Sequence, residues 1–141
     1  MSVDKTRIAE QFITAIPHSQ ALGMSLTEIG EGSAEIVMDY DSRFIGDPET
    51  GVIHGGAVSA LMDTCCGAAA MSHPDNPGLT ATIDLRIDYM RPATPGQRIR
   101  ARAECYHVTR SVIFVRARAM DDDGDRPVAT ATGTFTVESK P

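Results

Sequence analysis

The chain has 141 residues, of which 42% are apolar and 23% charged, a balance typical of a globular domain that folds without a disulfide or metal. Its formal net charge of −6 argues against a nucleic-acid partner, because proteins that bind nucleic acids are usually basic. Three cysteines, a start without a basic and apolar leader, and no apolar run long enough to span a membrane favour a cytoplasmic protein with no membrane partner.

The first part of the chain predicts one helix and one or two strands. Apolar residues at helical spacing over residues 3–16 indicate an amphipathic helix, which Pro17 is expected to end. The pattern over 22–29 is ambiguous and suggests an irregular first strand, whereas the alternation over 34–40 predicts a strand. Residues 41–52 are rich in Gly, Pro and Asp and predict a loop.

The second part is organised around an apolar segment over 54–71, predicted to be a long helix that the two prolines of 73–78 end. Four alternating segments follow it and predict strands over 79–89, 98–108, 111–120 and 127–137. Strands joined by hairpins and gathered around one buried helix predict an α+β domain with an antiparallel sheet. We expect a single domain over 1–141, with an N-terminal helix in 1–17 and a core over about 34–137.

The predicted central helix has two unlike faces. The apolar face, which we expect to pack on the sheet, contains Val58, Leu61, Met62, Cys65 and Ala69. The opposite face is made of small residues and one charge: Gly56, Ser59, Ala60, Asp63, Gly67 and Ala70. A carboxylate among apolar neighbours is costly unless it has a role. We therefore expect this face to look toward a cleft or a partner; the alternative is an Asp63 that simply faces solvent.

The start of this helix, His54-Gly55-Gly56, predicts a site for an oxyanion, because free backbone N–H groups and the positive end of the helix dipole meet there. A nearby carboxylate could attack a carbonyl group or activate water. Asp63, however, lies about 12 Å along the helix from Gly55 at 1.5 Å per residue. Two antiparallel copies of the helix could bring Asp63 of one chain near Gly55 of the other, so we expect a homodimer with shared sites.

These residues resemble a known family. His54-Gly55-Gly56, with Asp63 nine residues after the histidine, is similar to the signature of the hotdog-fold thioesterases of the 4-hydroxybenzoyl-CoA superfamily, in particular the PaaI-like branch. The segments 84–93 and 129–135 resemble that family's strand after the helix and its last strand. The resemblance implies a long helix wrapped by an antiparallel sheet, and two chains forming one continuous sheet in a homodimer or homotetramer. It implies hydrolysis of an acyl-CoA thioester, with no cofactor beyond the CoA of the substrate.

The resemblance also implies roles for single residues. Asp63 matches the catalytic carboxylate, as nucleophile or general base, Gly55 matches the oxyanion N–H donor, and His54 is its neighbour. Thr82 matches a Ser/Thr position that orients the attacking water, although strict alternation places it on the polar side of its strand, so that it needs a bulge or twist to reach the site. Several relatives place Asn or Gln six residues before the histidine, where this chain has Pro48. Either the loop is rearranged or the Gly55 N–H works without this helper, and a lower turnover or a different acyl group is the expected consequence.

Further candidates concern substrate binding. Gly56 lets a substrate approach the backbone, while Arg91 and Arg110, near strand ends, are candidates to hold the phosphates of CoA. The acidic segment 121–125 lacks the spacing of a calcium loop and predicts a solvated turn. We expect no metal. The alternative function is a non-catalytic hotdog module that binds acyl-CoA; a hotdog dehydratase is disfavoured because no Asp/His pair has the spacing expected of that branch.

Overall fold

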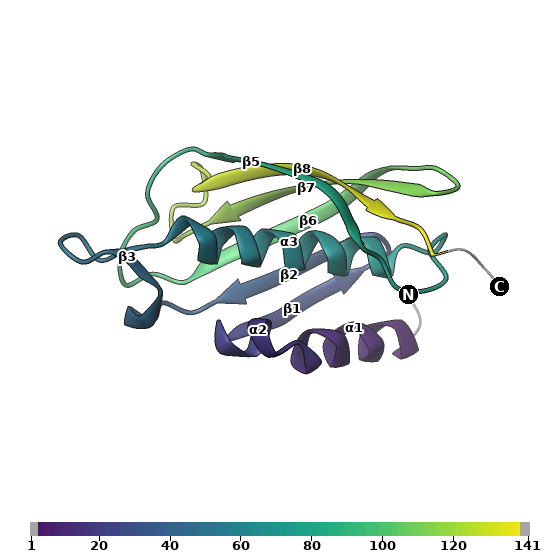
Figure 1. The fold of residues 1–141 in the computed structure, drawn as a ribbon, viewed down its shortest axis with the longest axis horizontal. Helices are drawn as coiled ribbons and strands as arrows, with labels where there is room; N and C mark the ends of the chain where they lie inside the picture. Colours follow the sequence, from purple (N-terminus) through teal and green to yellow (C-terminus); the bar gives the residue numbers. More distant parts are fainter. Residues whose placement is uncertain (1–2, 139–141) are drawn as a thin grey trace.

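The computed structural model describes residues 3–138. It contains three helices, a short 3₁₀ helix and eight strands: α1 (Val3–Ala15), α2 (Pro17–Ala21), β1 (Met24–Gly30), β2 (Ser33–Met38), η1 (Ser42–Phe44), β3 (Ile45–Asp47), β4 (Val52–Ile53), α3 (Gly55–Ser72), β5 (Thr82–Tyr89), β6 (Ile99–Val108), β7 (Val112–Met120) and β8 (Ala129–Thr136). Six strands form an antiparallel sheet in the order β1-β2-β6-β7-β8-β5, and α3 crosses one face of it (Figure 1). The predicted α+β hotdog architecture is confirmed.

The apolar face of α3 packs on the sheet as predicted. Leu61, Met62 and Cys65 are fully buried, and they share a core with small sheet residues such as Ala101 and Ala119. Small side chains on the sheet let the helix approach closely, so that the apolar face of the helix is almost completely buried. The prediction for Ala70 was wrong. It is buried because the chain folds back over the end of the helix, where the side-chain amide of Asn76 donates a hydrogen bond to the Ala70 carbonyl at 3.1 Å.

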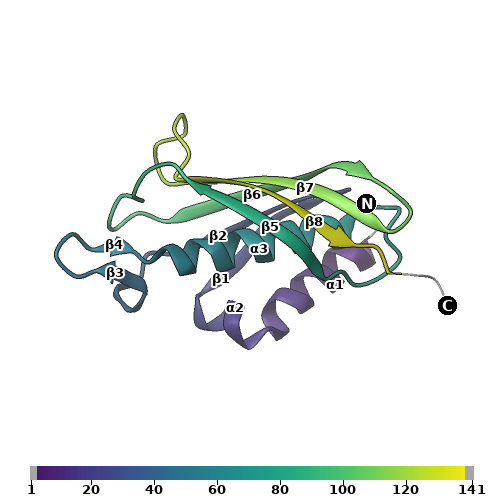
Figure 2. The ribbon, with the colours of Figure 1, turned by 45° about the horizontal axis from the view of Figure 1, so that its top comes forward.

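The predicted N-terminal helix ends before Pro17, as expected: α1 ends at Ala15. The sequence did not predict that Pro17 is also the first residue of a second, short helix, α2. Proline suits the first position of a helix, because the N–H group that it lacks has no partner within the helix anyway. Both helices lie beside β1, and Ile13 of α1 reaches the core (Figures 1 and 2).

The segment 41–52, predicted as a loop, has short regular structure. Asp41 caps η1 by accepting a hydrogen bond from the Arg43 N–H at 2.9 Å, and β3 and β4 form a two-stranded ribbon. The Tyr40 hydroxyl donates to the Gly51 carbonyl at 2.7 Å and ties this ribbon to the end of β2. The ribbon therefore has a fixed position at the end of the molecule where α3 begins (Figure 1).

The strand β5 forms the second edge of the sheet and pairs only with β8 among the described residues. Its predicted alternation holds in part: Leu85 and Ile87 are half-buried, but Ile83 and Tyr89 are more than half exposed. The pairing with β8 is irregular between Thr82 and Asp84, which shifts the start of the strand out of strict alternation. This edge thus carries both a bulge and uncovered apolar side chains.

Candidate active site

The start of α3 leaves one backbone donor unused. His54 caps the helix: its Nδ1 accepts a hydrogen bond from the Gly56 N–H at 2.8 Å, and its carbonyl accepts from the Ala57 N–H at 3.0 Å. The His54 N–H itself donates to the Phe44 carbonyl at 2.8 Å. Within residues 3–138 we find no hydrogen bond from the Gly55 N–H. The positive end of the helix dipole and a free donor therefore coincide at Gly55, where an oxyanion could bind.

The cap also fixes the state of the His54 ring. Because Nδ1 accepts a hydrogen bond, a neutral ring carries its proton on Nε2. The side chain is exposed, so Nε2 is open to solvent. A Cβ atom at Gly56 would lie 2.9 Å from His54 Nδ1, which explains why the third residue of this motif is glycine.

Asp63 lies on the opposite face of α3 from the core and is half-buried. The Thr82 hydroxyl of β5 donates a hydrogen bond to Asp63 Oδ1 at 2.8 Å. The irregular pairing after Thr82 provides the bulge that this contact was expected to need. None of the ion pairs found in the described part of the chain involves Asp63. Its second oxygen can thus serve a substrate or a water molecule.

Two further hydroxyl groups meet the helix start, and the sequence analysis missed both. The Tyr89 hydroxyl can donate to the Gly55 carbonyl at 3.0 Å, and so can the Ser59 hydroxyl at 3.1 Å. The two hydroxyl groups also hydrogen-bond each other. The spacing of Gly55 and Ser59, four residues apart on one helix, could have indicated Ser59. Tyr89 lies at the far end of β5, and no local pattern places it here.

A cavity of about 440 Å³ lies on the Tyr89 side of the helix start. Its lining is mostly apolar and consists of Val52, Ile53, Gly55, Val58, Tyr89, Met90, Arg91, Pro92, Ala93 and Val128. A second cavity, of about 320 Å³, lies on the other side of the helix start, and its lining includes His18, Arg43, Phe44 and His54. Two hollows therefore flank the free N–H group, one of them suited to an apolar group.

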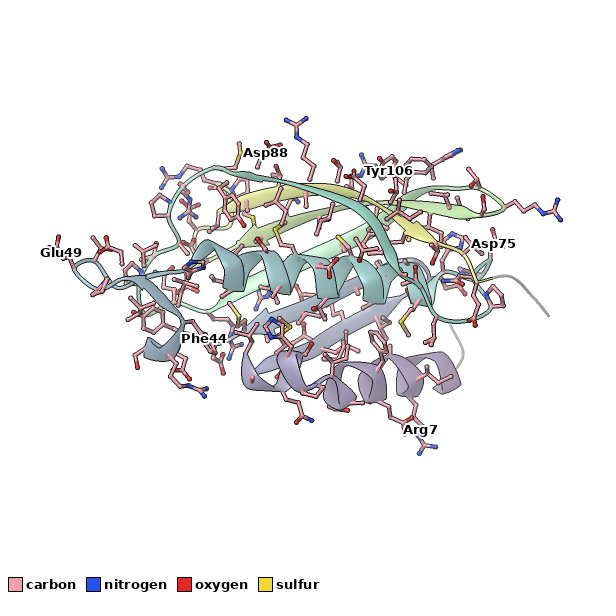
Figure 3. All side chains as sticks on the ribbon, in the orientation of Figure 1. Arg7, Phe44, Glu49, Asp75, Asp88 and Tyr106 are labelled. Atoms are coloured by element: carbon pink, nitrogen blue, oxygen red, sulfur yellow. The ribbon has the colours of Figure 1, made fainter. Side chains whose placement is uncertain are left out.

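Pro48 lies in the exposed turn between β3 and β4. Asp47 organises this turn, because its carboxylate accepts hydrogen bonds from the Glu49 N–H at 3.0 Å and the Thr50 hydroxyl at 2.8 Å. Figure 3 labels Glu49 at the tip of the ribbon, which projects beyond the start of α3. Proline has no polar side chain, so it cannot replace an Asn or Gln side chain at this position. Its predicted role in substrate binding stays a prediction.

Arg91, a candidate for the CoA phosphates, has other partners. Its guanidinium forms two hydrogen bonds of 2.7 Å with the carboxylate of Asp121 and also donates to the Arg126 carbonyl. This guanidinium holds the pKa of Asp121 well below its usual range. The segment 121–125 is therefore no simple solvated turn, since the Asp121 side chain is fully buried. A phosphate at Arg91 would have to compete with this carboxylate, which argues against the assignment.

Arg110 lies elsewhere. It is exposed in the turn between β6 and β7, at the end of the molecule where α3 ends (Figure 1). A single chain thus brings His54, Gly55 and Gly56 together at one point and Asp63 and Thr82 at another. It does not bring Arg110 to either.

Other chemistries find little support in the described residues. Burial raises the pKa of the Cys65 thiol to about 12, so this thiol is protonated near neutral pH and is no nucleophile. No group of three His, Cys, Asp or Glu side chains that could hold a metal ion occurs among the residues described. No helix in that part of the chain is long and apolar enough to cross a membrane.

Comparison with known proteins identifies similar chains. The family model of the thioesterase superfamily matches residues 50–128. The crystal structure of a Pseudomonas aeruginosa protein is 40% identical, with a TM-score of 0.83, over 94% of this chain and 98% of that one. The phenylacetic acid degradation protein PaaI of Thermus thermophilus, solved as a mutant, is 27% identical, with a TM-score of 0.77, over 87% and 100% of the two chains. A medium/long-chain acyl-CoA thioesterase of Salmonella typhimurium, YigI, is 25% identical over 92% and 91%.

Proposed function

Because the chain belongs to the thioesterase superfamily, we propose that it hydrolyses acyl-CoA thioesters in two sites shared by two copies of the chain. Each site takes the Gly55 N–H from one copy and Asp63 with Thr82 from the other. One observation carries this proposal. The helix that begins with the free Gly55 N–H also bears Asp63, a carboxylate that has no ionic partner in the described part of the chain.

One copy cannot bring these groups to one carbonyl, because eight residues of helix separate them by about 12 Å. A two-fold axis that relates two antiparallel α3 helices brings each Gly55 level with Asp63 of the other copy. The residues of the facing side, Gly56, Ser59, Ala60 and Gly67, are small and not fully buried, which permits a close approach.

The edge strand supports association of two copies. Four of the large apolar side chains that are exposed in a single chain lie on β5 or next to it: Leu79, Ile83, Tyr89 and Met90, exposed by 56%, 56%, 52% and 59%. A free strand edge with apolar side chains is a template for pairing with another strand. Antiparallel pairing of β5 with its copy would join the two sheets into one. The assembly is a homodimer, or a dimer of such dimers.

The reaction follows from these groups. The thioester carbonyl oxygen accepts a hydrogen bond from the Gly55 N–H, which stabilises the negative charge that develops on it. Asp63 either attacks the carbonyl carbon, to give an anhydride that water then hydrolyses, or removes a proton from a water molecule that attacks in its place. In both routes the carbon–sulfur bond breaks, and CoA leaves as a thiolate that takes up a proton. The acyl group, released as a free acid, occupies the apolar cavity beside Tyr89 and Met90.

A pair of inactive variants tests the shared site. Asp63→Asn removes the carboxylate, and Gly55→Pro removes the N–H with little change to the helix, because proline is tolerated at the first helical position. His54 already has an extended backbone (φ −59°, ψ 135°), as a residue before proline requires. Gly55→Ala is the matched control: it keeps the N–H, and its Cβ would meet the Tyr89 ring at 3.4 Å, an ordinary contact.

We expect each of the two variants alone to lose about 10²- to 10⁴-fold in kcat on an acyl-CoA panel. An equal mixture, unfolded and refolded together, should recover about a quarter of the wild-type activity: random association makes half of the dimers mixed, and each of these has one intact site. Recovery to a few per cent or less contradicts a shared site. A wild type that binds acyl-CoA esters without cleaving them would instead favour a binding module.

A further inference from the structure

The two ends of β5 contact the two halves of the proposed site. Its first residue, Thr82, donates a hydrogen bond to Asp63, and its last residue, Tyr89, can donate one to the Gly55 carbonyl. Thr82 holds the carboxylate half. We propose that Tyr89 is the positioning residue of the other half: it orders the first turn of α3 and thereby the Gly55 N–H. This inference rests on the proposed function, because it assigns the N–H the role of oxyanion donor.

The helix start needs such support because it consists of two glycines. Glycine in a helix is less stable than alanine by roughly 0.5–1 kcal/mol, since it has more conformational freedom to lose. A backbone donor stabilises an oxyanion fully only when it is already oriented before the reaction. His54 anchors the N–H groups of the two residues after Gly55. No side chain of Gly55 or Gly56 can add packing.

Tyr89 supplies the missing contacts from the carbonyl side. Two of its ring atoms lie 3.4 and 3.6 Å, and its hydroxyl oxygen 3.7 Å, from the position that a Cβ of Gly55 would occupy, so Tyr89 lies against this residue. Its hydroxyl, together with that of Ser59, hydrogen-bonds at the Gly55 carbonyl. Because Gly55 has no positive φ, the glycine is not required by its backbone conformation. A Cβ atom here would be in ordinary contact with the phenol ring at 3.4 Å, so the ring covers this residue closely without excluding an alanine.

Pairing of two β5 strands would place Tyr89 where both halves meet. An antiparallel arrangement that sets Thr82 of one copy opposite Tyr89 of the other brings the Asp63 contact of the first beside the Gly55 contact of the second. Tyr89 is 52% exposed in the single chain, although its hydroxyl is hydrogen-bonded at the helix start. The second copy would cover it, and hydrogen bonds shielded from water are stronger. Association of two copies would therefore strengthen the hydrogen bonds that order the helix start.

The test compares Tyr89→Phe with Tyr106→Phe, a tyrosine of β6 that is 46% exposed and stacks on Arg116. For Tyr89→Phe we expect kcat to fall about 3- to 10-fold, the loss from one hydrogen bond, with KM within about twofold of the wild type. Amide hydrogen exchange at Gly56 and Ser59, measured without substrate, should become faster by a similar factor. Tyr106→Phe should change neither quantity. Ser59→Ala should resemble Tyr89→Phe, and the double variant should lose less than the product of the two effects.

An unchanged kcat and unchanged exchange in Tyr89→Phe would overturn the inference. So would a loss of activity that only follows a lower dimer content, measured by light scattering at the assay concentration. Failure of the proposed function itself looks different: the wild type then cleaves no acyl-CoA, while the exchange rates still decide whether Tyr89 orders the helix start.

Discussion

The two edge strands of the sheet, β1 and β5, differ in what covers them. At the β1 edge, α1 and α2 of the same chain lie beside the strand (Figure 2). Polar contacts, such as the 2.7 Å ion pair between Arg102 and Glu28, lie on the surface there. At the β5 edge, apolar side chains such as Ile83 are exposed, and the pairing with β8 is irregular. The chain thus completes one edge by itself and leaves the other open. The open edge is also the one whose ends contact Asp63 and Gly55.

The largest expected effect comes from placing a charge on the open edge. In the proposed pairing of Thr82 with Tyr89, Ile83→Asp sets a carboxylate opposite Asp88 of the other copy, where desolvation and like-charge repulsion both oppose association. We expect a monomer by light scattering, with activity reduced by about 10²- to 10⁴-fold, as for loss of the catalytic base. The control is Ser25→Asp, the same charge on an exposed residue of β1, which should change neither property. An Ile83→Asp protein that is dimeric and active would show that the β5 edge tolerates a charge as well as the β1 edge does, and would contradict association through β5.

A second prediction concerns the segment that continues from β5. Arg91→Ala leaves the buried carboxylate of Asp121 without its cation, so we expect the free energy of unfolding to fall by about 3–5 kcal/mol. In the wild type the pair lowers the pKa of Asp121, so its contribution to stability is complete above the usual value of 3.8 and declines as the pH falls below it. Chemical denaturation from about pH 2 to pH 7 should show this acid-side decline in the wild type and a weaker one in Arg91→Ala.

The Arg91 result also separates structure from substrate binding. Activity of the folded fraction should keep its KM for acyl-CoA, because the guanidinium is already occupied by Asp121 and a backbone carbonyl. A raised KM with unchanged stability would restore Arg91 as a phosphate ligand. Arg110→Ala is the matched comparison, since it removes an exposed arginine at the other end of the molecule.

The smallest expected effect is at Thr82. Thr82→Ala removes one hydrogen bond to Asp63, so kcat should fall about 3- to 10-fold while the dimer and its stability are retained. Thr82→Ser keeps the hydroxyl and should recover most of the activity. Equal losses in both variants would indicate that the methyl group matters more than the hydroxyl. Steady-state kinetics and light scattering decide between the two.

Much of the fold was predictable because its signals are local. The period of the apolar residues in 54–71 defined the long helix and its buried face, including Leu61 and Met62. Prediction failed where a distant segment changed the environment. Ala70 lies on the small face but is covered by the returning chain at Asn76. Pro17 ends the first helix as predicted, but the second helix that begins with it was not predicted.

Part of the candidate site was predictable from the sequence for the same reason, and part was not. The motif His54-Gly55-Gly56 with Asp63 was visible in the sequence because one helix and its N-cap residue carry all four residues. The arginines were not predictable, since nothing near Arg91 in the chain reveals that its partner lies 30 residues later. The acidic segment 121–125 was predicted to be a solvated turn for the same reason, since the partner of Asp121 lies 30 residues earlier. Side chains that pair across the fold leave no periodic signal.

The sequence alone determined the helix, its small-residue face, its glycine start and its single carboxylate, because each of these depends on neighbours within a few turns. Only the tertiary structure decided which side chains from other elements contact the carboxylate and the glycine start. Thr82 reaches Asp63 across 19 residues, and Tyr89 reaches Gly55 across 34. Both contacts depend on how the edge strand β5 crosses α3 and on the irregular pairing after Thr82. Such geometry arises when the whole sheet packs around the helix, and no segment specifies it on its own.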